Sequence, residues 1–490
     1  MINNPQIYEI NTRVWINRFA TKKAPVKITQ VPKVYWQTIK DLGFDYVWLM
    51  GMWQTVPDSV EKYCFVDNLL KEYTAALPDW KKENVVGSPY AIDKYIINPI
   101  FGSTEDLITL KETLHNYGLK LLLDFIPNHF HAETSLLQTN PEIFLEANEE
   151  LNSIDGTTFY KAENSEKYYA HGRDPYFPAW QDTIQVNYFS QKSRDFMTEQ
   201  LLAISELCDG VRCDMAMLSL NEIFNKTWNY VISSYKIPSN EFWSVAIKKV
   251  KEKNPDFLFV AEAYWNLEYY LQKLGFDFTY DKTLYDKLLK GDVNSLREYF
   301  KADIDYQSKL VRFLENHDEP RSAEKFSLTK LKAAAVIAYT VPGMRLFFDG
   351  QFEGKTIKLP VQLGREPVEE ANPNFQIFYD RLLGIIEDDI FKFGEWKLLT
   401  PLTRGGTDKT YNNILTWSWT YKDNFRLIAI NYSQFISTCH IKLDLTKIGA
   451  SVNFYDEINN VYYGRNTENL KSIGLYIELK PFRGHILKII

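Results

Sequence analysis

Charged and apolar residues alternate in the stretch from Cys208 to Leu218, which reads CDGVRCDMAML. In a β-strand this alternation places Arg212 and Asp214 on one face and their apolar neighbours on the other. Burying an arginine and an aspartate together is costly unless the two groups serve each other or a ligand. Taken alone, the pair is as consistent with a structural ion pair as with a catalytic carboxylate held by its arginine.

Carboxylates and imidazoles also stand at the ends of three other apolar runs. LKLLLDFIPNH contains Asp124 and ends in His129, FLFVAEAY contains Glu262, and LVRFLENHD ends in His317 and Asp318. Carboxylates that share a pocket raise one another's pKa, so one can stay protonated while another stays ionised. Glycosidic bond cleavage needs such a pair, because one carboxyl group protonates the leaving oxygen and another faces the anomeric carbon. A divalent metal site is less favoured, because no His-x-His pair lies within the predicted strands.

Predicted strands and helices alternate over roughly the first 390 residues. Amphipathic stretches such as Ser103–Tyr117, which Gly118 would end, separate short apolar runs. A first strand is expected over Ile7–Ile16, and the eight predicted strands begin at Ile7, Asp45, Leu119, Gly210, Phe257, Phe276, Leu310 and Met344. Eight strands that alternate with helices predict an α/β fold, a (β/α)8 TIM barrel. Active sites of this fold lie at the C-terminal ends of the strands, where the polar residues described above would meet.

The alternation changes character at two places. The period breaks down over residues 130–188, which predicts a long excursion after the third strand. After about residue 390, runs such as ILTWSWTY, RLIAINY and LYIELK lack intervening helices and predict an antiparallel β-sandwich. The expected organisation is therefore a catalytic barrel of residues 1–129 and 189–390, an inserted domain of residues 130–188 and a C-terminal β-sandwich of residues 391–490.

The composition narrows the class of ligand. Aromatic residues make up 15% of the chain, and flat amphipathic rings are good platforms for sugars. The net charge is −7 and no basic run occurs, so neither nucleic acid nor an anionic membrane is an expected partner. No apolar run is long enough to span a membrane, and the first residues do not resemble a signal peptide. Four scattered cysteines are expected to be reduced thiols, and the expected location is cytoplasmic.

Five motifs of the chain resemble the α-amylase family of glycoside hydrolases, family 13. The four signature motifs of that family are similar to DFIPNH (Asp124–His129), GVRCDMA (Gly210–Ala216), VAEAYW (Val260–Trp265) and FLENHDEPR (Phe313–Arg321). The run GSPYAIDKYIINPIFGSTEDL (Gly87–Leu107) is similar to the stretch that follows strand two in the family. The four signatures occur in order on four predicted strands.

The resemblance implies a role for each matching residue. Asp214 would be the nucleophile, Glu262 the general acid/base, and Asp318 the third carboxylate, which binds hydroxyls of the distorted sugar. Further substrate contacts are implied for Tyr90, His129, Arg212, His317, Arg321 and Trp265. The implied mechanism is retaining double displacement on α-1,4-glucans or maltooligosaccharides, with the carboxyl oxygens of the nucleophile and the acid about 5–5.5 Å apart. The chemistry requires no cofactor.

The sequence departs from the family pattern at three places. Met217 and Leu218 stand where many starch-cleaving members have Lys-His, and Gln185 stands in the fifth signature, where an acidic residue or amide is usual. Both places often help to bind structural calcium, so a calcium site is doubtful and no metal ligand is assigned. Residues 349–367 replace a usual short turn, and the sequence assigns them no role.

Two other functions are compatible with the same motifs. A transglycosidase or isomerase, of the 4-α-glucanotransferase or trehalose synthase type, would share the covalent intermediate and pass the sugar to another acceptor. A non-catalytic sugar-binding protein is less favoured, because such relatives usually lose one of the three carboxylates. The sequence leaves open endo or exo action and the oligomeric state.

Overall fold

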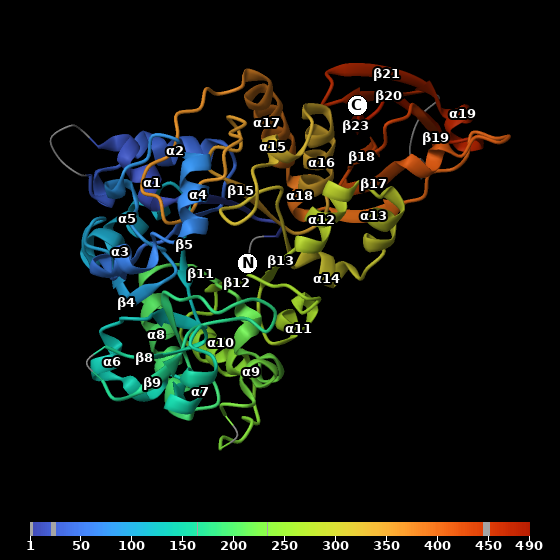
Figure 1. The fold of residues 1–490 in the computed structure, drawn as a ribbon. Coiled ribbons are helices and arrows are strands. Elements are labelled where there is room, and N and C mark those ends of the chain that lie inside the picture. The colour runs from blue at the N-terminus through green and yellow to red at the C-terminus, as the bar shows by residue number, and fades with distance from the viewer. Residues whose placement is uncertain (1–2, 21–25, 164, 233, 444–450) are drawn as a thin grey trace.

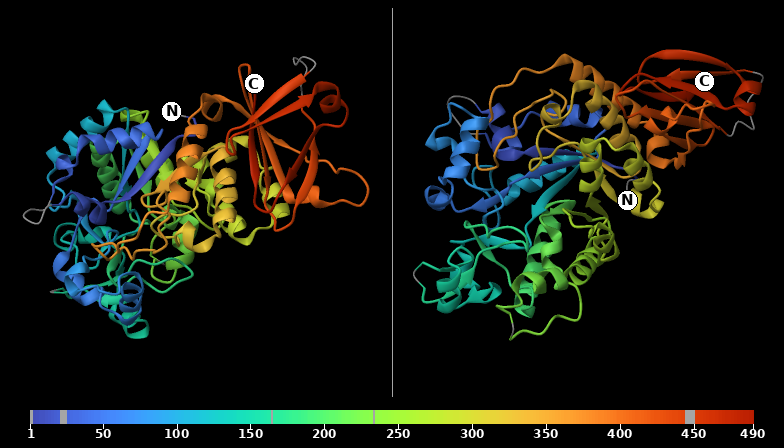
Figure 2. Two further views of the ribbon diagram at one scale, coloured as in Figure 1. Left: turned by 90° about the horizontal axis from the view of Figure 1, so that it is seen from above. Right: turned by 45° about the vertical axis from the view of Figure 1, so that its right-hand side comes forward.

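Eight parallel strands close into a barrel (Figures 1 and 2). The computed structural model describes residues 3–20, 26–163, 165–232, 234–443 and 451–490. The barrel strands are β1 (Gln6–Asn11), β2 (Tyr46–Met50), β5 (Lys120–Phe125), β11 (Gly210–Cys213), β12 (Leu258–Ala261), β13 (Phe278–Tyr280), β14 (Leu310–Arg312) and β15 (Met344–Phe348). Because β1 pairs with both β15 and β2, the sheet has no free edge. All eight predicted strands and the (β/α)8 barrel are confirmed.

The first strand is shorter than predicted. β1 ends at Asn11, and the chain continues as the short helix α1 (Thr12–Trp15) instead of extending to Ile16. Val14 and Trp15 are buried by this turn of helix. A short run of buried apolar residues does not distinguish a strand from a helical turn, which is why the boundary was placed too late.

Helices cover the outside of the barrel (Figure 2). The longer ones are α2 (Lys33–Asp41), α5 (Thr104–Asn116), α8 (Gln191–Leu207), α10 (Phe242–Lys253), α12 (Lys282–Lys290), α16 (Leu328–Thr340) and α17 (Pro373–Ile386), and shorter ones are α9 (Asn221–Trp228), α11 (Glu268–Lys273), α13 (Val293–Tyr299), α14 (Ile304–Ser308), α15 (Ser322–Lys325) and α18 (Asp389–Phe393). The Ser103 side chain caps α5 by accepting from the Asp106 amide, and Gly118 follows the helix with a positive φ. Val211 and Cys213 pack in the apolar layer under the helices, so Arg212 points into the barrel.

Two long excursions leave the C-terminal ends of barrel strands. The first lies between β2 and α5 and contains β3 (Trp53–Thr55), α3 (Val60–Tyr63), α4 (Asp67–Ala76) and β4 (Ile92–Ile97). The second follows β5 and contains β6 (His129–His131), α6 (Leu136–Thr139), β7 (Glu146–Ala147), α7 (Glu149–Ile154), β8 (Phe159–Lys161), β9 (Tyr168–Ala170) and β10 (Thr183–Gln185). Its strands form two small sheets, β7-β9-β8 and β10-β6.

The C-terminal part consists mainly of antiparallel strands. A six-stranded sheet has the order β16 (Glu395–Leu399), β17 (Ile414–Tyr421), β18 (Asn424–Asn431), β23 (Gly484–Ile489), β20 (Ser451–Asp456) and β21 (Val461–Asn466). A second sheet pairs β19 (Ser437–Ile441) with β22 (Leu475–Leu479), which α19 (Thr467–Ser472) precedes, and a common apolar core lies between the sheets. The predicted sandwich is confirmed. It is joined to the barrel by hydrogen bonds such as that from the Trp419 indole to the Thr340 carbonyl, 2.7 Å.

The structure also bears on the expectations about the cysteines and about membrane-spanning segments. All four cysteines are buried free thiols, as expected. None of the helices in the described ranges has the length and apolar character that crossing a membrane requires.

Candidate active site

Three carboxylates meet around one arginine at the C-terminal ends of the barrel strands. Arg212 Nη1 lies 2.6 Å from Asp214 Oδ1, and its Nη2 lies 2.9 Å from Glu262 Oε2 and 3.7 Å from Asp318 Oδ2. These residues come from β11, from the residue after β12 and from the segment after β14. The structure therefore brings together the four residues that the sequence marked most strongly.

The guanidinium of Arg212 is completely buried and surrounded by rings. The ring centres of Trp48, Tyr90 and Tyr280 lie 5.3, 5.5 and 5.5 Å from its central carbon. Aromatic faces attract the cation without neutralising it. The positive charge is therefore held rigidly below the carboxylates, where it can orient them and favour their ionised forms.

Barrel hydrogen bonds continue up to the carboxylates themselves. The Asp214 amide donates to the Phe125 carbonyl at 2.8 Å, and the Glu262 amide donates to the Cys213 carbonyl at 3.0 Å. Beyond Asp214 the chain turns at Met215, whose φ is +41°, and the Met215 amide donates to Glu262 Oε2 at 2.7 Å. A non-glycine residue in this region is strained, and such strain is typical of functional turns.

Different environments separate the acidities of the three carboxyl groups. Burial, opposed by Arg212 and reinforced by Asp214 and Asp318, raises the pKa of Glu262 to about 7. Burial also raises the pKa of Asp214, and its direct contact with Arg212 limits that rise. Desolvation would raise the pKa of Asp318, but His317 and Arg212 outweigh it and hold this pKa below its usual range. One group is thus poised to donate a proton while another stays ionised.

His317 is held between two acids. Its Nδ1 lies 2.5 Å from Glu9 Oε1, its Nε2 lies 2.9 Å from Asp318 Oδ2, and the Tyr90 hydroxyl lies 2.7 Å from Nε2. Burial alone would lower the pKa of His317, but Asp318 and Glu9 raise it to about 10, so the imidazole is a cation at neutral pH. Tyr90 also stacks on this ring at 5.3 Å. The structure thus places both predicted contacts, Tyr90 and His317, beside Asp318.

His129 differs from His317 in its charge. Burial lowers the pKa of His129 to about 4, so its ring is neutral, and it lies 5.2 Å from the ring of Trp180. His129 and His131 do form a His-x-His pair on β6, but both nitrogens of His131 are engaged, by the Glu133 amide and by Ser59 Oγ. Within the described ranges, no group of three or more His, Cys, Asp or Glu side chains could hold a metal ion.

Asp124 braces the site instead of facing the cleft. It is 1% exposed, and it accepts from the Trp48 indole at 3.1 Å and from the Gly51 amide at 2.8 Å. Its main-chain carbonyl accepts from the Trp53 indole at 2.7 Å. These bonds fix the end of β2 against β5, which favours the supporting role of Asp124 over substrate contact.

Two further predicted substrate contacts, Arg321 and Trp265, follow β14 and β12 in the chain. Arg321 binds Glu315 at 2.7 Å and the Asp349 carbonyl at 2.9 Å, and it lies over the Phe348 ring at 4.2 Å. Its contacts join the segments after β14 and β15, and its role toward substrate stays a prediction.

Trp265 follows Glu262 closely in a left-handed turn. Its φ is +63°, and its ring meets the exposed ring of Tyr176 edge-on at 5.0 Å. Met217 and Leu218, which replace a polar pair of the family, are buried. The segment after β12 and the excursion after β5 meet through the two aromatic rings of Trp265 and Tyr176.

Sequence reasoning missed two residues that touch the site. Glu9, on β1, is fully buried against His317, and the Tyr264 hydroxyl donates to Glu262 Oε1 at 2.8 Å. Tyr264 lies two residues after Glu262, so it could have been considered as a neighbour on the same face. Glu9 had no comparable signal, because its partner lies 308 residues away in the chain.

The place where the family often binds calcium is filled by an amide. Gln185 Nε2 donates to the carbonyl and to the side-chain oxygen of Asn128, both at 2.9 Å, and to the Val186 carbonyl at 3.0 Å. Calcium would need these oxygens as ligands. Gln185 Oε1 is itself buried without a hydrogen-bond partner in the described part of the chain, so the expectation about calcium stays a prediction.

Comparison with known proteins agrees with this geometry. Residues 35–372 match the model of the α-amylase catalytic domain, so the chain belongs to the α-amylase family. It is 24% identical over 271 residues to the α-amylase MalA of Haloarcula japonica and 25% identical over 312 residues to α-amylase 2 of Dictyoglomus thermophilum. These matches cover 54% and 59% of this chain but only 36% and 48% of the two amylases. A 4-α-glucanotransferase of Thermotoga maritima is 24% identical over 70% of this chain and 68% of its own length.

Solved structures share the whole fold. A maltogenic α-amylase of Thermotoga neapolitana aligns with a TM-score of 0.69 at 19% identity, covering 99% of both chains. An α-amylase of Lactobacillus plantarum aligns with a TM-score of 0.68 at 20% identity, also over 99% of both chains. At these identities the likeness shows the fold and not the activity.

Proposed function

We propose that this protein is a retaining glycoside hydrolase that acts on α-1,4-glucans or maltooligosaccharides. The observation that carries the proposal is the cluster in which Asp214, Glu262 and Asp318 converge on Arg212. Two carboxyl groups with separated acidities are what a double displacement requires. Membership of the α-amylase family and the names of its amylase relatives support an α-glucan as substrate.

In the first step, an oxygen of Asp214 attacks the anomeric carbon of the sugar. Glu262, protonated up to about pH 7, gives its proton to the glycosidic oxygen, and the leaving sugar departs as an alcohol. Asp318 and the cationic His317 would bind hydroxyls of the same ring as positive charge develops on it.

In the second step, water replaces the leaving group. The ionised Glu262 takes a proton from that water, whose oxygen attacks the anomeric carbon and releases Asp214. Arg212 lies against Asp214 and Glu262, so it would stabilise the nucleophile as it becomes an anion again.

Product analysis on a panel of α-glucans and disaccharides tests this proposal, with Asp214→Ala as the blank. We expect shorter α-glucans from the wild-type protein and none from the variant. Turnover by Asp214→Ala equal to the wild type would contradict the assignment of the nucleophile. Binding of maltooligosaccharides in calorimetry with no turnover would favour a sugar-binding protein instead.

Transfer to a second sugar is the other candidate reaction. The exposed ring of Tyr176 beside Trp265 supports it, because a ring platform for an acceptor sugar competes with water for the covalent intermediate. Incubation with maltotriose separates the two reactions. Oligosaccharides longer than the substrate indicate transfer, whereas glucose and maltose alone indicate hydrolysis.

A further inference from the structure

A long segment follows the last barrel strand and passes along the C-terminal rim of the barrel to the excursion after β2. We call residues 350–372 the crossbar; it connects β15 to α17 and appears in orange in Figure 1. It reaches the excursion that follows β2, where the Val86 amide donates to the Gln362 carbonyl and the Gly364 amide donates to the Asn84 carbonyl, both at 2.8 Å. The two partners of each bond lie far apart in the chain, but β15 and β2 both neighbour β1 in the barrel, so the crossbar spans the rim above β1.

Apolar contacts fix the middle of the crossbar. Leu363 is completely buried, in a cluster with Tyr73, Leu77 and Val85 from the first excursion, and Leu359 packs against the same cluster. A surface loop with no binding partner would not bury a leucine in this way. The crossbar is therefore docked on the excursion and forms part of the wall of the cleft.

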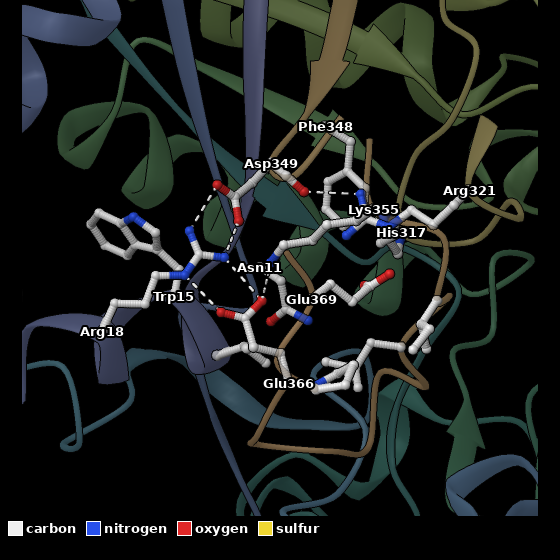
Figure 3. Close-up of a pocket in the computed structure, with 14 residues that line it drawn as sticks. Asn11, Trp15, Arg18, His317, Arg321, Phe348, Asp349, Lys355, Glu366 and Glu369 are labelled. Atoms are coloured by element: carbon white, nitrogen blue, oxygen red, sulfur yellow. Dashed lines mark hydrogen bonds and ion pairs between the residues drawn. The ribbon is translucent and has the colours of Figure 1, made fainter. Parts of the chain in front are cut away.

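Ion pairs fix the ends of the crossbar. Arg18, which follows β1, lies 2.5 Å from Asp349 and 2.7 Å from Glu366, and Lys355 lies 2.6 Å from Glu366. Figure 3 shows these side chains turned toward one another around a cavity. A further pair joins Arg365 to Asp79 in the first excursion, outside the cavity, at 2.9 Å.

The cavity beneath the crossbar borders the catalytic cluster. Its lining includes Asn11 at the end of β1, Lys355 and Glu369 of the crossbar, and His317, the same histidine that contacts Asp318. The Lys358 ammonium also donates to the Asp318 carbonyl, so the crossbar reaches the edge of the reaction centre. Whatever extends from the reacting sugar toward this side meets the crossbar.

The barrel order shows which end of a substrate lies on this side. Glu262, the proposed proton donor to the leaving sugar, follows β12. β1 lies opposite β12, because the closed order runs β1-β15-β14-β13-β12 in one direction and β1-β2-β5-β11-β12 in the other. The donor sugar and any unit attached to its non-reducing end therefore extend away from β12, toward β1, β15 and the crossbar.

We propose that the crossbar closes the donor end of the cleft, so that the enzyme removes short units from the non-reducing ends of α-glucans and does not cut within chains. This inference rests on the function proposed above and adds the end from which the substrate is attacked. The substrate class is then short maltooligosaccharides and free chain ends. Long chains would enter only by their non-reducing termini.

The test compares two forms of maltoheptaose that carry a fluorophore at the reducing end. One has a free non-reducing end, and the other has that end blocked by a 4,6-O-ethylidene group. We expect the free form to shorten stepwise and the blocked form to react at least about a hundredfold more slowly, because its bulky end cannot enter the closed pocket. Similar rates on both forms, with products cut in mid-chain, would overturn the inference.

Variants of the crossbar sharpen the test. Leu363→Ser removes the buried leucine. The double variant Lys358→Ala, Arg365→Ala removes only exposed polar contacts, so it is expected to fold even where Leu363→Ser does not. In variants whose crossbar becomes sensitive to a protease, we expect the cleavage rate of the blocked substrate to rise about tenfold relative to that of the free one. Lys161→Ala is the control, because it removes an exposed ion pair with Glu166 that lies away from the crossbar.

Failure of the role proposed for the crossbar can be distinguished from failure of the proposed hydrolase function. A released crossbar with an unchanged ratio between the two substrates would overturn the role of this segment while the proposed hydrolase stands. Failure of the wild-type protein to cleave either substrate would overturn the proposed function together with this inference.

Discussion

Arg212 and Arg312 are both completely buried in the barrel, and they have different roles. Arg312 pairs with Asp281, and its other nitrogens donate to the Pro342 carbonyl and to Gln307, so every nitrogen of the guanidinium has a hydrogen-bond partner. Arg212 faces three carboxylates. Its Nη2 makes ion pairs but no hydrogen bond of good geometry within the described part of the chain.

The difference separates a structural pair from a reactive one. Asp281 is 1% exposed and also caps α12 through the Leu284 amide, so its oxygens are fully used. Asp318 is 45% exposed, and one arginine cannot satisfy three acids. Burial and the neighbouring carboxylates raise the pKa of Glu262, whereas His317 and Arg212 keep that of the exposed Asp318 low, so this cluster stays available to a substrate. The ratio of carboxylates to arginines, and not burial, marks the active site.

The largest expected effect is on catalysis at the Arg212 cluster. Glu262→Gln keeps the shape of the side chain but removes its proton transfer, so we expect kcat/KM on maltooligosaccharides to fall by roughly 10²–10⁴-fold. Circular dichroism should show an unchanged fold. Retention of most of the activity would remove Glu262 from the role of general acid.

The next effect is on stability at the Arg312 pair. Asp281→Ala leaves a buried guanidinium without its carboxylate, and breaking such a pair costs about 3–5 kcal/mol of unfolding free energy. Urea denaturation measures this loss, and the activity of the protein that remains folded should change little. Lys161→Ala, which breaks an exposed pair, should leave the unfolding free energy almost unchanged. Equal costs for the two variants would contradict the comparison.

The sequence predicted more of the site than of its surroundings. Asp214 and Glu262 were found because strand ends are marked by apolar runs and because a barrel brings strand ends together. Glu9 was missed, since nothing local relates it to a histidine on another strand. The docking of Leu363 against Val85 was missed for the same reason, because a contact between distant loops depends on packing and leaves no periodic pattern.

A third prediction uses the pKa of Glu262 as a stability measurement. Its pKa is raised from an ordinary 4.5 to about 7, so the folded protein binds the proton more tightly than the unfolded chain does. Ionisation therefore costs stability as the pH rises above 4.5, and the full cost is present above about pH 7. We expect Glu262→Gln to be more stable than the wild type by about 1–3 kcal/mol at pH 8 and nearly equal to it at pH 4.

Two tyrosines provide a smaller and more selective test. Tyr264 donates to Glu262 at 2.8 Å, and Tyr299 donates to Asp281 at 2.6 Å, so each arginine cluster contains one such bond. Removing a donor to a carboxylate destabilises its anion and raises its pKa. In Tyr264→Phe the alkaline limb of the pH–rate profile should move upward by up to about one pH unit.

The matched variant Tyr299→Phe should leave the pH–rate profile in place. It should lower the unfolding free energy by about 1 kcal/mol, because it removes one partly buried hydrogen bond. A shift of the profile in both variants would show that the two clusters are not independent, and a shift in neither would exclude Tyr264 as a positioning residue for the acid.

The smallest expected effect is that of a chelator. The amide of Gln185 donates to the oxygens of Asn128 and Val186 that a calcium ion would need, so a hydrogen bond already joins β6 to β10 there. Excess EDTA should shift the melting temperature by no more than about 1 °C, since a bound ion would otherwise add its binding free energy to the stability of the fold. A large fall in the melting temperature that calcium reverses would mean that a cation is held elsewhere. Gln185→Glu offers the complementary measurement. A carboxylate beside the Asn128 oxygens should make the melting temperature rise on addition of calcium.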